Sequence, residues 1–194
     1  MAKVAWNVPM RQLTTSSMRV ARTITALFIA LIVSAIFSGA TTLQRLSMTE
    51  MVQKSTSILR AKVTGKRAAF RGQDIYTYYQ LQASETLKAG PAVVELAVPG
   101  GVVGGLQQIG IGSPELAIGG DYVIFLWTSP SGLTQIIGLS QGLFVTGSGT
   151  DPILTRASIG EAMVDSNGHP AQDTGVSIRL SALRTLIQQA GTAK

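Results

Sequence analysis

The sequence predicts a mainly β domain: a small antiparallel OB-like barrel or sandwich of five to seven strands, with a short N-terminal helix and a C-terminal helix. Apolar and polar residues alternate over 57–64 and again over 75–87, which is the period of a half-buried strand. Glycine-containing turns recur at short spacing, and helical spacing of apolar residues is confined to 48–52 and 180–187. A closed barrel is attractive because closure removes exposed sheet edges.

The first 40 residues have the layout of a secretory signal peptide. An apolar run covers Ala26 to Phe37, and the small residues Ser38 and Ala40 follow it. Four basic residues precede the run: Lys3, Arg11, Arg19 and Arg22. We favour cleavage after Ala40 and export to the periplasm or beyond. The alternative is an uncleaved anchor in which residues 23–40 hold the protein in a membrane by its N-terminal helix.

Charge and cysteine content exclude several classes of function. Of 16 basic residues, 4 lie in the leader, so 16 − 4 = 12 remain against 10 acidic residues. The net charge of +6 therefore comes mostly from the leader, and we expect no nucleic-acid partner. Without cysteine there is no disulfide, thiolate metal site or cysteine nucleophile.

Local signals divide the remaining chain. Ser47 and Glu50 form a capping-box pattern that predicts a helix starting at residue 48. A β-barrel domain is expected over 41–147, in which the near-continuous apolar run 121–127 is a strand buried on both faces. A polar loop or hairpin region over 148–175 contains the turn signal Asn167-Gly168. The C-terminal helix is expected over 176–194.

The glycine-rich stretch after Ala97 does not fit a phosphate-binding loop. Gly100 and Gly105 have the separation of a P-loop, but Leu106 and Gln107 stand where Lys and Ser or Thr are required. We therefore expect a long connection in which glycine serves backbone geometry. A long loop in a small domain is often a binding element, and its expected partner-binding residues are Val102, Val103, Leu106, Gln107 and Ile109.

Catalytic patterns are missing from the sequence. His169 is the single histidine, so neither a histidine-based triad nor a multi-histidine metal centre can form. The carboxylates are scattered without paired spacing, and Asp121 is expected to bond loop amides at a strand entrance. We expect no enzyme activity, no cofactor and no metal.

One strand carries a basic face. Arg60, Lys62 and Lys66 recur at strand spacing, and Tyr76 and Tyr78 occupy the strand that pairs with it. Cations interleaved with aromatic residues on a small barrel are typical of surfaces that bind polymers. These five residues form a hypothetical anion site; the alternative is an ordinary solvated face.

Several segments resemble a class of uncharacterised exported bacterial β-barrel proteins. They are SMTEMVQKSTSILRAKVTG, TYYQLQASETLKAG, VPGGVVGGLQQIGIGSPELAIGGDYVIFLW and GLSQGLFVTG, which together span Leu46 to Gly147. In strand order and glycine rhythm that class is similar to the OB-fold modules of tissue inhibitors of metalloproteinases and netrins. The resemblance implies a barrel and a binding role. It implies no inhibitory residue, because those inhibitors use an N-terminal cysteine held by disulfides.

The sequence thus predicts an exported, non-enzymatic binding protein that recognises a protein or an anionic polysaccharide or lipid surface. The alternative is a structural subunit of a membrane or envelope assembly, anchored by its N-terminal helix. Whether the chain forms an oligomer is left open.

Overall fold

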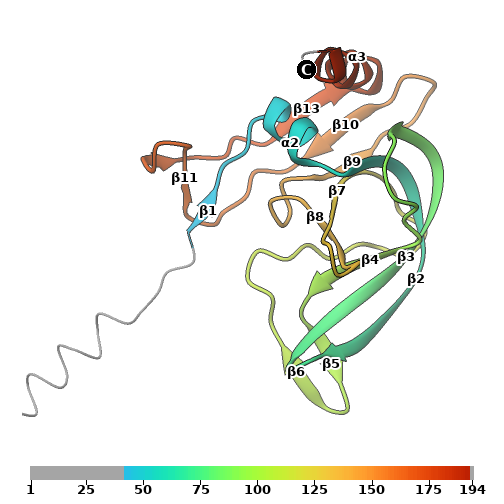
Figure 1. Cartoon of the computed structure of the whole chain (residues 1–194), viewed down its shortest axis with the longest axis vertical. Coiled ribbons are helices and arrows are strands. Elements are labelled where there is room, and N and C mark those ends of the chain that lie inside the picture. The colour runs from blue at the N-terminus through green and yellow to red at the C-terminus, as the bar shows by residue number, and fades with distance from the viewer. Residues whose placement is uncertain (1–41, 193–194) are drawn as a thin grey trace, which may run out of the picture. The chain divides into compact units, whose positions relative to one another are not determined.

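The computed structural model describes residues 42–192, drawn in colour in Figure 1. The expected signal peptide or anchor over 1–40 lies outside these residues. The helices are α2 (Met48–Lys54) and α3 (Leu180–Thr192). The strands are β1 (Leu43–Gln44), β2 (Ser57–Arg71), β3 (Asp74–Lys88), β4 (Glu95–Pro99), β5 (Gly101–Val103), β6 (Leu106–Gln108), β7 (Asp121–Thr128), β8 (Thr134–Ile136), β9 (Leu143–Thr146), β10 (Ile153–Arg156), β11 (Met163–Val164), β12 (Pro170–Ala171) and β13 (Val176–Arg179).

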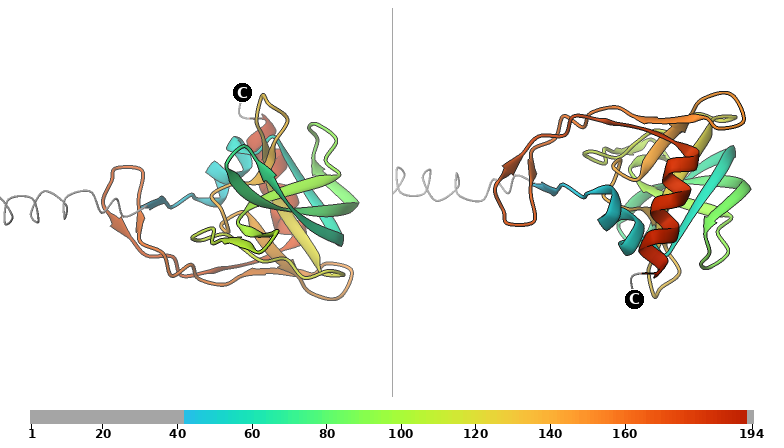
Figure 2. Two further views of the ribbon diagram at one scale, coloured as in Figure 1. Left: turned by 90° about the horizontal axis from the view of Figure 1, so that it is seen from below. Right: turned by 90° about the horizontal axis from the view of Figure 1, so that it is seen from above.

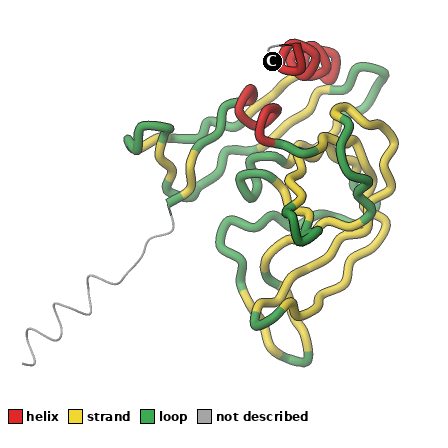
Figure 3. Tube along the Cα trace, viewed as in Figure 1, coloured by secondary structure: helices red, strands yellow, loops and turns green. Residues whose placement is uncertain are grey.

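The described chain is mainly β and its main sheet is antiparallel, as predicted. This sheet has eight strands in the order β13-β10-β9-β7-β2-β3-β4, with β8 paired to β7. Two small sheets, β1-β11-β12 and β5-β6, accompany it (Figure 3). The strand number exceeds the predicted five to seven. The edge strand β4 approaches β8, but no β-ladder joins the two among residues 42–192, so the sheet is not closed.

The long hairpin β2–β3 confirms the two alternating segments. Its register runs from Ile58 opposite Lys88 to Arg71 opposite Asp74, around a turn at Gly72 and Gln73. Three register shifts interrupt the ladder, and the last lies between Val63 and Gly65. A bulge adds one residue to one strand, so the residues beyond it change faces.

Strand β7 separates two hydrophobic cores, which explains its continuous apolar run. Tyr122, Ile124 and Leu126 pack in the core enclosed by β2, β3, β4 and β8. Val123 and Phe125 point to the other face, where the helices and strands β9 and β10 cover them. Figure 2 shows α2 and α3 lying beside each other on this second face. The predicted strand with two buried faces is confirmed.

The helix α2 begins where the capping box predicts. The hydroxyl of Ser47 accepts a hydrogen bond from the backbone N–H of Glu50, and the Glu50 carboxylate accepts one from the N–H of Ser47. At its other end, the ammonium of Lys88 donates to the carbonyls of Val52 and Ser55 at 2.7 and 2.6 Å. These contacts satisfy backbone groups that a helix leaves unpaired at its ends.

The C-terminal third contains more strand than predicted. Residues 153–156 of the expected polar region form β10 inside the main sheet, because Leu154 and Arg156 are buried. Residues 176–179 form β13 rather than the start of the helix, which begins at Leu180. The hairpin predicted at Asn167-Gly168 is present between β11 and β12. Within residues 42–192, no helix combines the length and apolar character that crossing a membrane requires.

Candidate functional site

The glycine-rich segment folds as a β-hairpin rather than the predicted long connection. Strands β5 and β6 pair Gly101 with Gln108, Val102 with Gln107 and Val103 with Leu106. Gly104 and Gly105 join them with φ values of 57° and 83°, the left-handed conformation that a two-residue hairpin turn requires. The sequence carried the signal, since a Gly-Gly pair lies between two short apolar runs.

Close backbone contacts hold this hairpin against the distal end of β2 and β3 (Figure 1). The N–H of Gly100 donates to the carbonyl of Ile75 at 2.8 Å, and the N–H of Ile75 donates to Oε1 of Gln108 at 2.7 Å. Gly101 has φ of 141°, and a Cβ there would lie 2.7 Å from the hydroxyl of Thr77. Only glycine lets the backbone at position 101 come this close to β3, so the position of the hairpin depends on Gly101.

The predicted partner-binding residues differ in exposure. Val102, Leu106 and Ile109 are exposed by 58%, 63% and 78%, Gln107 is exposed, and Val103 is half-buried. Ile111, two residues after Ile109 along the chain, is also exposed. The stretch from Leu96 to Pro114 contains no charged residue. Because large apolar side chains gather here without charge, this hairpin is the strongest candidate binding element of the described chain.

A groove lies between the hairpin and the main sheet. Its volume is about 540 Å³, and its lining includes residues of both predicted sets: Lys66 from the basic face, and Val102 with Gln107 from the hairpin. Thr77, Tyr79 and Val98 line its sheet side. The ammonium of Lys66 lies 2.9 Å from the carboxylate of Glu115, and this hydrogen bond raises the pKa of Lys66.

The structure divides the predicted basic face. Lys62 pairs with the exposed Gln82, whereas Lys66, beyond the bulge at Gly65, pairs with the buried Tyr79. Since residues 79 and 82 of an alternating strand lie on opposite faces, Lys66 projects away from Lys62. The expectation that Arg60, Lys62 and Lys66 project together is therefore wrong for Lys66, because the bulge reverses its face.

Carboxylates of the same chain already bind most of these cations. Arg60 donates to Asp121, with Nη2 to Oδ2 at 2.7 Å, and this hydrogen bond raises the pKa of Arg60. Asp121 thus accepts hydrogen bonds from a guanidinium group rather than from the loop amides that we expected. The exposed Lys62 has a position on the same face as Arg60.

The two predicted tyrosines lie together, with a different cation. Tyr76 and Tyr78 have ring centroids 6.3 Å apart. The guanidinium of Arg67 stands over the Tyr78 ring at 4.5 Å and binds Glu95 at 2.9 Å. The aromatic and basic interleaving is therefore present, but Arg67, which is outside the predicted set, provides it.

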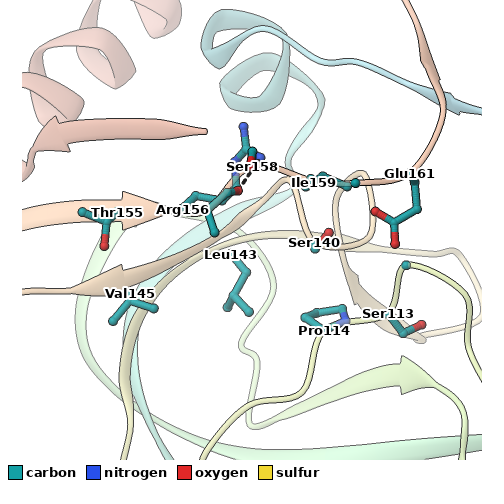
Figure 4. A pocket seen from close by; sticks show the side chains of 13 residues that line it. Ser113, Pro114, Ser140, Leu143, Val145, Thr155, Arg156, Ser158, Ile159 and Glu161 are labelled. Carbon is teal, nitrogen blue, oxygen red and sulfur yellow. Dashed lines mark hydrogen bonds between the residues drawn. The ribbon is translucent and has the colours of Figure 1, made fainter. Parts of the chain in front are cut away.

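A second cavity, of about 420 Å³, lies on the other side of the 112–114 segment (Figure 4). Ser140, Leu143, Thr155 and Glu161 contribute to its wall. Beside it, Arg156 makes a buried ion pair with Asp173, which lowers the pKa of that carboxyl group through their hydrogen bonds. The sequence does not predict this pair, because a separation of 17 residues across polar sequence gives no local signal.

Residues 42–192 contain no group of three histidine, aspartate or glutamate side chains arranged to hold a metal ion. His169 lies at an exposed turn with Nδ1 3.4 Å from Oδ2 of Asp165.

The sequence matches no protein-family model and no curated protein. Function is therefore inferred from the residues themselves.

Proposed function

We propose that the protein is an exported, non-enzymatic binding protein and that the β5–β6 hairpin is its binding element. The supporting observation is the exposure of Val102, Leu106 and Ile109 within a stretch of chain that has no charge. Exposed apolar side chains that gather in one segment mark surfaces that bind partners. The glycine contacts under the hairpin hold these side chains in a fixed position.

The partner offers an apolar surface rather than an anionic polymer. Arg60, Lys66 and Arg67 already contact Asp121, Glu115 and Glu95 respectively. An anionic polymer would have to displace these three carboxylates or bind against their charge. The apolar hairpin has no such competitor within the described chain.

We also propose that the protein is exported and that its main sheet forms an OB-like barrel. The layout of residues 1–40 supports a cleaved signal peptide, and the anchored subunit is the alternative. The intact mass of the protein isolated from its own cells distinguishes them, because cleavage gives a chain that starts at Thr41.

The main sheet curves so that its edge strand β4 lies close to β8. This curvature supports an OB-like, partly open barrel.

Site-specific photo-crosslinking in the producing cells tests the binding element. A photoreactive amino acid at Leu106 should give an adduct with another envelope component. The same amino acid at Val145, which is 54% exposed on β9, is the matched control and should give none. A chain that folds normally and gives no adduct from either position would remove the hairpin as the binding element.

A further inference from the structure

We infer that the apolar surface that the hairpin contacts is a lipid bilayer, into whose interface the hairpin tip inserts. This inference rests on the proposed function, because it names the partner of the same hairpin. The insertion surface consists of exposed side chains of the two neighbouring hairpins: Phe70, Val102 and Leu106 near the turns, and Ile109 directly after β6. Val102 and Leu106 project from opposite faces of the β5–β6 ladder, so both faces of the hairpin enter the interface.

The β2–β3 turn and the base of the β5–β6 hairpin lie at the same end of the main sheet. Phe70 lies beside the β2–β3 turn and is 50% exposed. The β5–β6 hairpin packs on the same end, since a Cβ on Gly101 would contact Ala68 and Ile75. Figure 1 shows the β2–β3 turn next to β5 and β6. Apolar side chains from the two adjacent hairpins can therefore enter one interface together.

The chemistry of the tip favours lipid over protein. Residues 96–114 contain no tryptophan, tyrosine or arginine, the side chains that dominate the energetics of protein interfaces. Apart from Gln107, the large exposed side chains of the hairpin are instead aliphatic, like the hydrocarbon they would enter. The β5–β6 ladder also pairs the hairpin backbone, and unpaired backbone groups are what hydrocarbon penalises most.

The charges beside the tip suit a bilayer with anionic headgroups. Arg71, directly after Phe70, is exposed and makes its contact with a neutral group, the Ser131 hydroxyl, at 3.3 Å. The nearest carboxylate along the chain, Asp74, accepts a hydrogen bond from Nε2 of Gln108 at 3.4 Å. A few aliphatic side chains give reversible attachment, so anionic lipid should strengthen it through Arg71.

An environment-sensitive label tests insertion directly. The sequence contains no cysteine, so Leu106→Cys in the full chain carries a single nitrobenzoxadiazole (NBD) dye. Vesicles of phosphatidylethanolamine and phosphatidylglycerol should raise the dye's emission about twofold or more and shift it to the blue, as on entry into the acyl boundary. Ile153→Cys, which labels an exposed position of β10, is the matched control and should not respond.

The dye has to report on position 106 itself, because the apolar run at 26–37 can bind the full chain to vesicles without the hairpin. Val102→Ser and Ile109→Ser in the Leu106→Cys background should abolish most of the emission change. An unchanged dye at position 106 on vesicle-bound protein would overturn the inference. So would a Leu106 crosslink in cells to a protein rather than to lipid, although the proposed function would then stand.

Discussion

Arg156 and Asp173 form a doubly hydrogen-bonded ion pair that is almost closed to solvent. Nη1 donates to Oδ2 at 2.5 Å and Nη2 to Oδ1 at 2.8 Å, while the two side chains are only 6% and 4% exposed. Oδ2 of Asp173 also accepts the backbone N–H of Ile159 at 2.8 Å. The pair thus holds the segment 157–175, which carries β11 and β12, against the end of β10.

Removing one partner should be costly. Asp173→Ala leaves a buried guanidinium without its counter-charge, and we expect the free energy of unfolding to fall by about 3–5 kcal/mol. The double variant Arg156→Met with Asp173→Leu removes both charges and should lie near the wild type. Urea denaturation measures all three. Equal losses in the single and double variants would show that packing, not charge, carries the effect.

The same pair should make stability depend on pH. Arg156 holds the pKa of Asp173 below its usual range. As pH falls, the unfolded chain therefore takes up the proton first, so stability present above the unfolded pKa of about 4 is lost below it. Because the double variant lacks this carboxylate, its free energy of unfolding should fall less than that of the wild type as pH falls from 6 toward the folded pKa. A constant difference between the two would contradict this linkage.

Where local pattern decides the structure, the sequence analysis succeeded. The alternation in β2 and β3 reflects burial of one face, the capping box at Ser47 depends on a short segment, and the apolar run of β7 reflects burial of both its faces. The hairpin β5–β6 could have been predicted from Gly104-Gly105. Its strands are only three residues long, which is too short for an alternating pattern to indicate them.

Other features depend on contacts between distant residues. Strand β10 lies between β9 and β13 and buries Leu154 and Arg156, although the polar Thr155 and Arg156 give no sign of a strand in the sequence. The face that Lys66 occupies depends on one bulge, and a bulge leaves hardly any trace in an alternating pattern. The partners of Arg60 and Arg67 are 61 and 28 residues away.

The central strand offers a sharp contrast between neighbours. Phe125 is fully buried with its ring 5.6 Å from that of Phe144, whereas Trp127 is 42% exposed. Phe125→Asp buries an unpaired charge and should prevent folding, because that cost rivals the whole stability of a domain. Trp127→Asp should remain folded and lose about 1 kcal/mol. Circular dichroism and thermal melting compare them; cooperative melting of the Phe125 variant near the wild-type temperature would contradict the two-core description.

Two glycines of the hairpin should respond differently to alanine. At Gly104 the added Cβ meets nothing within 4 Å, so Gly104→Ala should cost only the left-handed backbone strain of about 1 kcal/mol. At Gly101 the Cβ would also collide with Thr77, and we expect about 2 kcal/mol or more. Chemical denaturation of the two variants measures which of them loses more free energy of unfolding. A smaller loss at Gly101 would mean that the hairpin does not rest on β3.

The last prediction concerns the basic face. Because Arg60 and Lys66 already bind carboxylates and lie on opposite faces, they should not act together on an anionic polymer. The variant R60Q/K62Q/K66Q should therefore bind dextran sulfate no more weakly than a control with the same net charge. That control is R45Q/K54Q/R179Q, which removes three exposed cations from other elements. Both should show the same salt dependence, since only overall charge would steer the polymer. Thermal melting first shows whether the variant still folds when Asp121 has lost its partner Arg60. The affinity for dextran sulfate is then measured for both variants over a range of salt concentrations. A much larger loss in the first variant than in the control would restore a specific anion site on this strand.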